Sequence, residues 1–124
     1  MAPSIVLLLL LASACVHAGE PKADPATASN VVVLVANDGL PDADIFAVHD
    51  GIRFRVGFVH SNTTVALHVP VGALEIGNDL NLVVHQIGES RDYVAGTVHV
   101  AGDEVAELDI APAVQFSTLW VRSR

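Results

Sequence analysis

The sequence is poor in cysteine and in basic residues, and both scarcities exclude structures or functions. Cys15 is the only cysteine, so no disulfide can form within the chain. Lys and Arg number 6 against 14 Asp and Glu, which gives a net charge of −8. Because binding to a phosphate backbone depends on Lys and Arg, we do not expect nucleic acid as a partner. The acidic balance would also repel an anionic lipid surface, so membrane contact should come from an anchor.

The longest apolar run, residues 5–14, is too short to span a membrane. A bilayer core needs about twenty apolar residues, whereas this run has the length of a signal peptide. It ends in Ala12-Ser13-Ala14-Cys15, which resembles the lipobox of bacterial lipoproteins, although Ala12 stands where that motif most often has Leu. The resemblance implies a signal peptide over 1–14 and a lipid on Cys15. The mature protein would then be anchored to a membrane outside the cytoplasm, on the periplasmic or cell-surface side.

Two alternatives to lipidation stay open. Val16-His17-Ala18 allows ordinary signal cleavage after Ala18, and the chain could also be a cytosolic protein with an apolar N-terminus. The position of the lone cysteine at the end of the apolar run favours lipidation. Residues 15–29 are rich in Pro, Ala and small polar residues, which indicates a tether that could extend about 40 Å.

Residues 30–124 predict one all-β domain. Short apolar, Val-rich runs alternate with turn signals every 8–12 residues or so, which is typical of a sandwich or barrel. We therefore expect a single antiparallel β-sandwich of seven or eight strands, immunoglobulin-like or transthyretin-like, with a closed barrel as the alternative. The expected strands are 31–37, 43–49, 52–59, 64–69, 80–86, 93–100, 104–110 and 114–121.

The clearest local signal is a hairpin across Asp50-Gly51, a pair that accepts the positive φ angles of a type I′ turn. The turn predicts that His49 lies opposite Ile52, Ala47 opposite Phe54, and Ile45 opposite Val56. One face of the hairpin would then join the core, namely Ile45, Ala47, Ile52, Phe54, Val56 and Phe58.

The opposite face of this hairpin is a possible partner surface, formed by Phe46, Val48, Arg53 and Arg55. Phe46 would lie opposite Arg55, whose stem could cover the ring. The plainer interpretation is a solvated outer face with one shielded aromatic ring. Val83 is expected to point outward as well.

The runs Val31–Asn37, Pro41–Gly51 and Arg53–Gly57, together with the closing residues 105–121, resemble uncharacterised bacterial exported lipoproteins with a small β-sandwich domain. Such domains begin with a Val-rich strand, a proline-containing loop, an alternating strand and a tight turn. The resemblance covers most of residues 30–124. It implies a fold and an extracytoplasmic location, and no function.

Five histidines fall in the domain and invite a metal hypothesis, because histidine is a common metal ligand. They are His49, His60, His68, His85 and His99. Their spacing matches no known ligand pattern, so we expect surface histidines and no metal. Asp38, Asp42 and Asp44 cluster near Asn37, but they fit no EF-hand loop.

No catalytic constellation is apparent. The sequence has no G-x-S-x-G motif, Cys15 lies outside the domain, and Ser61 beside His60 is a turn pair. We therefore expect no enzyme and no cofactor. The expected function is a membrane-anchored structural or protein-interaction module with a partner in the cell envelope. The alternative is a periplasmic metal- or small-ligand-binding protein that uses its surface histidines.

Overall fold

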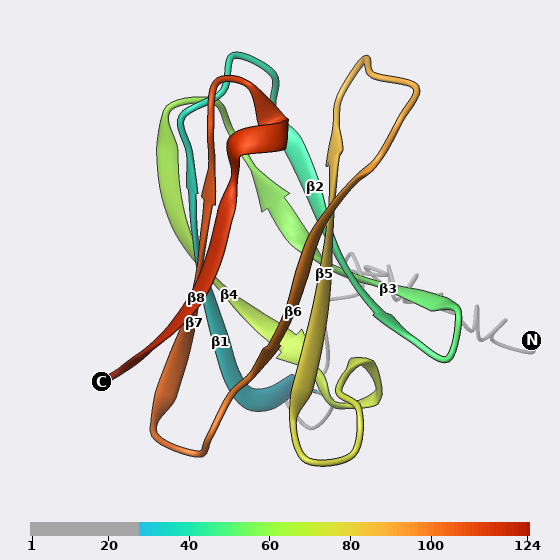
Figure 1. Cartoon of the computed structure of the whole chain (residues 1–124), viewed down its shortest axis with the longest axis vertical. Coiled ribbons are helices and arrows are strands. Elements are labelled where there is room, and N and C mark those ends of the chain that lie inside the picture. Colours follow the sequence, from blue (N-terminus) through green and yellow to red (C-terminus); the bar gives the residue numbers. More distant parts are fainter. Residues whose placement is uncertain (1–27) are drawn as a thin grey trace, which may run out of the picture.

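The computed structural model describes residues 28–124, and these form two four-stranded β-sheets packed face to face (Figure 1). The expected β-sandwich with eight strands is confirmed. The strands are β1 (Ala28–Asn37), β2 (Ala43–His49), β3 (Ile52–Val59), β4 (Thr63–Pro70), β5 (Asp79–Gln86), β6 (Tyr93–His99), β7 (Glu104–Ile110) and β8 (Thr118–Ser123). Two short 3₁₀ turns complete the described fold, η2 (Val71–Ala73) and η3 (Val114–Phe116).

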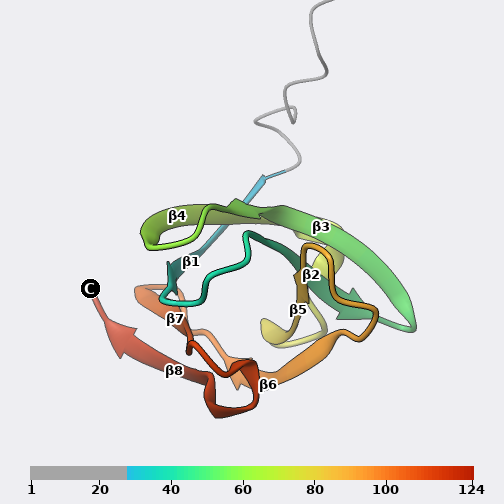
Figure 2. The same ribbon diagram turned by 90° about the horizontal axis from the view of Figure 1, so that it is seen from above.

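The first sheet has the strand order β4-β1-β7-β8 and the second β3-β2-β5-β6 (Figure 2). Neighbouring strands are antiparallel except β1 and β7, which run parallel. The sheets remain separate, so the alternative of a closed barrel is excluded for the described residues. The expectation of purely antiparallel sheets needs one correction, the parallel pair of β1 and β7. The order also differs from the ABED and CFG sheets of immunoglobulin constant domains, which favours the transthyretin-like alternative.

The core lies between the sheets and is built mainly from branched aliphatic side chains. Alternate residues of each central strand point inward, as the period of a β-strand requires. Ile45, Leu82 and Leu108 are fully buried and come from both sheets. On β5 and β7 the core positions recur at every second residue, namely Leu80, Leu82 and Val84, and Ala106, Leu108 and Ile110. The other members of the core cluster include Val33, Val35, Ala43, Ala47, Val59, Val69, Leu80, Val84, Val100, Ala106 and Ile110.

The hairpin between β2 and β3 has the predicted turn. Asp50 and Gly51 have φ angles of 51° and 73°, as a type I′ turn requires. His49 lies opposite Ile52 and Ala47 opposite Phe54, as expected. The side chain of Ile52 is nevertheless 58% exposed, because it lies next to the turn at the tip of the hairpin. Its predicted place in the core is wrong.

A β-bulge changes the register further along this hairpin. Ile45 pairs with Gly57 instead of Val56, while Phe46 still pairs with Arg55. A bulge inserts one unpaired residue and shifts the alternation of the strand beyond it. Phe58 therefore pairs with the outward-facing Asp44 and does not join the core. Gly57 faces the core instead, where a Cβ atom would approach Cδ2 of Leu67 from the other sheet to 2.6 Å.

The last predicted strand, 114–121, begins later than expected. Residues 114–116 form η3, and β8 starts at Thr118. The backbone N–H groups of Phe116 and Ser117 donate to the carbonyls of Ala113 and Val114, and Oγ of Ser117 accepts from the N–H of Ala111. These bonds close a turn before the strand begins.

Replacing Ile45 by Ala should lower the free energy of unfolding by about 2–5 kcal/mol, because the side chain is fully buried and its removal leaves a cavity. Urea unfolding followed by the fluorescence of Trp120 measures the change. Ile76→Ala is the matched control, since Ile76 is 99% exposed, and it should change stability by less than about 0.5 kcal/mol. Equal losses in the two variants would contradict the assigned core.

Candidate functional site

The partner surface predicted from the sequence lies on the outer face of the second sheet. Phe46 and Val48 project from β2 and are half-buried, whereas Arg53 and Arg55 project from β3 and are exposed. Phe46 lies opposite Arg55 as expected. The guanidinium over the ring, however, is that of Arg53, at 4.4 Å from the ring centroid. Such a cation–π contact shields the ring from solvent.

Arg55 is directed elsewhere by an ion pair. Its Nη2 lies 2.8 Å from Oδ1 of Asp44 on the neighbouring strand. Val83, the other residue expected to be outward and apolar, does pair with Phe46 on the outer side, but it is only 7% exposed. On this face the ring of Phe46 is therefore covered by Arg53 and Val83 is buried, whereas Val94, which pairs with Val83 on β6, is 62% exposed.

The same face carries a second charged network, centred on Asp92. Oδ2 of Asp92 lies 2.8 Å from Nη2 of Arg53, and Oδ1 lies 2.7 Å from Nδ1 of His85. The hydrogen bond from His85 and the positive charge of Arg53 hold the pKa of Asp92 below its usual value of 3.8, and they outweigh the opposing effect of burial. With Nδ1 engaged, Nε2 is the ring nitrogen of His85 left for another ligand.

Four of the five domain histidines lie near a carboxylate. His99 holds Nδ1 at 2.9 Å from Asp79, and His49 and His60 lie 3.3 and 3.6 Å from Asp50 and Asp42. Each pair is separate from the others. Within residues 28–124, no group of three or more His, Cys, Asp or Glu side chains is arranged to hold a metal ion.

The acidic loop that follows β1 is organised by a buried asparagine. Asn37 is fully buried; its Nδ2 donates to the carbonyl of Pro41 at 2.9 Å and its Oδ1 accepts from the N–H of Gly39 at 3.0 Å. Asp42 accepts from the N–H of Ser61 at 2.8 Å. These bonds, typical of Asx turns, account for the arrangement of the loop without a bound ion. Asp44 belongs to the ion pair with Arg55.

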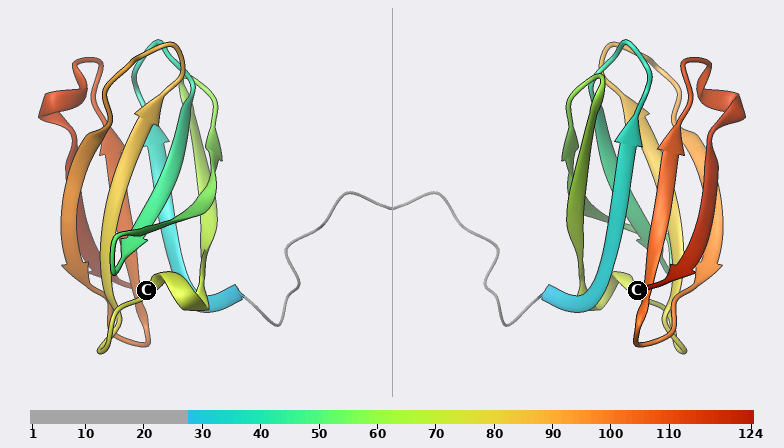
Figure 3. Two further views of the ribbon diagram at one scale, coloured as in Figure 1. Left: turned by 90° about the vertical axis from the view of Figure 1, so that its right-hand side faces the viewer. Right: turned by 90° about the vertical axis from the view of Figure 1, so that its left-hand side faces the viewer.

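Three loops at this end of the sandwich each expose a large apolar side chain. Leu40, Ile87 and Phe116 are 86%, 48% and 72% exposed. All three loops lie at the end of the sandwich where β1 finishes, and the views of Figures 1 and 3 agree on this placement. We call Leu40, Ile87 and Phe116 together the loop-end surface.

Hydrogen bonds join the loop of Leu40 to the loop of Ile87 and to the end of β7. The N–H of Ile87 donates to the carbonyl of Asp42 at 2.9 Å, and the N–H of Asp38 donates to the carbonyl of Ile110 at 2.9 Å. The loop of Phe116 is closed by its own turn bonds, described above. The loop-end surface is therefore presented by a backbone that is held in place.

Carboxylates surround the loop-end surface. Within residues 28–124, Asp38, Glu89 and Asp109 form no ion pair. Burial, together with the negative charges of Asp38 and Glu107, raises the pKa of Asp109 above its usual 3.8. Arg91 is the one arginine on these loops. Acidic side chains therefore outnumber basic ones on these loops and at the end of β7.

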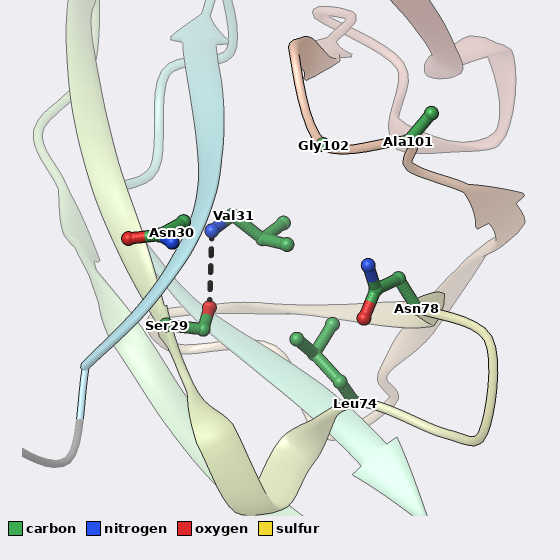
Figure 4. A pocket seen from close by; sticks show the side chains of 7 residues that line it. All are labelled: Ser29, Asn30, Val31, Leu74, Asn78, Ala101 and Gly102. Carbon is green, nitrogen blue, oxygen red and sulfur yellow. Dashed lines mark hydrogen bonds between the residues drawn. The ribbon is translucent and has the colours of Figure 1, made fainter.

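The opposite end of the sandwich holds a small open pocket with a volume of about 190 Å³. Figure 4 shows Val31 and Leu74 directed into it, with Asn78 beside them. Oγ of Ser29 accepts from the N–H of Val31 at 3.1 Å. The pocket is smaller than the roughly 300–1,000 Å³ of typical small-molecule sites, and it lies beside the start of β1.

The candidate residues expected from the sequence and those found in the structure differ. Cys15, the predicted signal peptide and residues 15–27 of the predicted tether lie outside the described residues, whereas Ala28 and Ser29, which were expected in the tether, begin β1. The loop-end surface was missed because Leu40, Ile87 and Phe116 fall in segments interpreted only as turns or as strand. The available signal was an apolar residue inside a polar turn, as in Asp38-Gly-Leu-Pro-Asp42.

Comparison with protein-family models, curated proteins and solved structures gives no match for this chain. Among residues 28–124 there is also no helix of the length and apolarity needed to cross a membrane.

Two carboxyl substitutions should change the pH dependence of stability in opposite directions. Asp92 has a lowered pKa, so it stabilises the fold above its unfolded pKa of about 4 and loses this contribution as the pH falls through the folded pKa. Asp92→Asn should therefore be less stable at about pH 7 and should lose less stability than the parent between about pH 5 and pH 2.

Asp109→Asn is the counterpart, because Asp109 has a raised pKa and so destabilises the fold at neutral pH. This variant should be more stable than the parent at about pH 7, and the gain should vanish as the pH falls below about 4. Urea unfolding at a series of pH values measures both effects. Parallel pH profiles for the parent and both variants would contradict these assignments.

Proposed function

We propose that the chain is a non-enzymatic protein of the bacterial cell envelope, anchored to a membrane by a lipid on Cys15. Its β-sandwich acts outside the cytoplasm as a structural or protein-interaction module. The observation that carries the interaction role is the exposure of Leu40, Ile87 and Phe116 on loops held at one end of the sandwich. Exposed apolar side chains that gather at one place are typical of protein–protein contacts.

The charged groups of the described residues support a non-enzymatic role. A nucleophile needs a base within hydrogen-bond reach and a third group that orients the base. His85 and His99 each have an orienting Asp. Within residues 28–124, the hydrogen bonds of the serine hydroxyls go to backbone groups and none goes to a histidine.

The competing proposal is a periplasmic metal- or small-ligand-binding protein. It is favoured by the Nδ1-to-carboxylate bonds of His85 and His99, since metal-ligating histidines usually donate their second N–H in this way. Each of these histidines would bring one Nε2 ligand, and a tight Zn²⁺ site needs three or four converging ligands. The interaction module is therefore the better supported function.

The anchor is tested by Cys15→Ser. The variant should incorporate no palmitate and should leave the membrane fraction, because each buried CH₂ of an acyl chain contributes about 0.8 kcal/mol to membrane binding. Labelling with radioactive palmitate and fractionation of cells measure both effects. Ser13→Ala is the matched control and should remain in the membranes. Unchanged labelling of the Cys15→Ser variant would refute the anchor.

Metal titration separates the two proposals. The interaction module predicts that a small excess of Zn²⁺, Cu²⁺ or Ca²⁺ leaves the melting temperature unchanged, because a ligand that binds only the folded state raises it. Calorimetry of the full chain measures the shift. A rise that disappears in His85→Gln or His99→Gln would favour the metal-binding protein and overturn the interaction module.

A further inference from the structure

The loop-end surface combines exposed apolar side chains with carboxylates that form no ion pair within residues 28–124. Asp38 lies two residues before Leu40, and Glu89 two residues after Ile87. Asp38 also donates its backbone N–H to the carbonyl of Ile110, the residue that follows Asp109 on β7. The same end of the sandwich therefore presents apolar contact area and negative charge together.

We propose that the loop-end surface is the docking site for a second protein, and that this partner presents an apolar patch flanked by Lys or Arg. The proposal rests on the interaction role proposed above and specifies its site and the chemistry of its partner. Leu40, Ile87 and Phe116 supply the apolar contact. Asp38, Glu89 and Asp109 supply the charge that the basic side chains of the partner would neutralise.

An apolar surface could also bind a second copy of this chain or a lipid bilayer. Charge complementarity favours a basic partner protein over both. A second copy, docked by a two-fold axis, would bring the same carboxylates of both chains together, and like charges held close repel each other. A bilayer with anionic lipids would be repelled for the same reason. A basic protein gains from both features of the surface.

The position of the surface in the fold agrees with this choice. β1 starts at Ala28 and ends at Asn37, so the loop-end surface lies a whole strand away from the point where residues 1–27 join the sandwich (Figure 3). Ten residues of strand extend about 33 Å. In a protein anchored through its N-terminus, the loop-end surface would therefore lie on the side of the sandwich away from the anchor, where a partner could reach it.

The opposite end of the sandwich provides a matched control. Ile52, Val71 and Ile76 are 58%, 56% and 99% exposed there. The fold therefore offers apolar residues at each end that can be replaced without entering the core. Substitutions at the two ends should cost a similar, small amount of stability.

The test uses the full chain in its own membranes with p-benzoylphenylalanine in place of Phe116, and in a second protein in place of Ile76. Irradiation should attach the probe at 116 to another protein, and mass spectrometry should place the attachment in an apolar segment next to Lys or Arg. The yield should fall in about 0.5 M NaCl, because salt screens exposed charges. The probe at 76 should not capture the same protein.

Two sets of substitutions then examine the contributions of the surface with the probe still at 116. Leu40→Ser with Ile87→Ser should lower the yield about fivefold or more, and Asp38→Asn with Glu89→Gln should lower it and weaken its dependence on salt. Ile52→Ser with Val71→Ser is the control and should leave the yield unchanged. Thermal unfolding of each variant confirms that the fold is retained.

The possible contrary outcomes separate the two proposals. Attachment of the probe at 116 to a second copy of this chain, to lipid, to an acidic segment or to nothing overturns the docking site. If a probe at 76 or in place of Val48 captures a protein while the probe at 116 does not, the interaction module stands and only its location is wrong. If none of the three probes captures a protein, both proposals fail.

Discussion

The pairing of β1 with β4 on one side and with β7 on the other is the constraint on which the rest of the structure depends. β1 buries Val31, Val33 and Val35 between the sheets. It is a central strand of the first sheet, with β4 on one side and β7 on the other. Its partner β7 comes near the end of the chain, so this sheet is complete only when almost the whole domain has folded. To form such non-local pairs, the chain must lose the entropy of a long loop before the contacts stabilise it. This is typical of slowly folding β-proteins.

The last residue of β1 also fixes the loop that follows the strand. Asn37 is the last residue of the strand and is fully buried, so its amide must find partners inside the protein. It finds them in the backbone of Gly39 and Pro41, and its carbonyl accepts from Asn62. The loop that carries Leu40 is thus fixed from the core outward. Groups that are already ordered lose less entropy when a partner binds.

Local chemistry predicted much of the fold from the sequence. The turn at Asp50-Gly51 and the existence of the eight strands depend on neighbouring residues, and they were predicted correctly. The parallel pairing of β1 with β7 could not be predicted in this way, because it depends on which distant strands meet. The bulge was missed for a related reason: Gly57 is required there by Leu67 of the other sheet.

The candidate site was less predictable than the fold. From the sequence we expected Arg55, which lies opposite Phe46, to cover the ring, whereas Arg53 does so. The choice is made by two acids on other segments, since Asp44 binds Arg55 and Asp92 binds Arg53. The loop-end surface depends on three loops that are far apart in the sequence. Their common location follows from the strand order, which the sequence did not reveal.

The exposed side chains of Leu40, Ile87 and Phe116 give up the stability that their burial would contribute. Burial of apolar surface contributes about 25 cal/mol per Å², and a domain of this size has little stability to spare. Polar residues in these turns would satisfy the same backbone hydrogen bonds, because those bonds come from Asn37, Asp42 and main-chain groups. The apolar side chains are therefore not needed to form the loops. The docking site proposed above would account for their presence beside unpaired carboxylates.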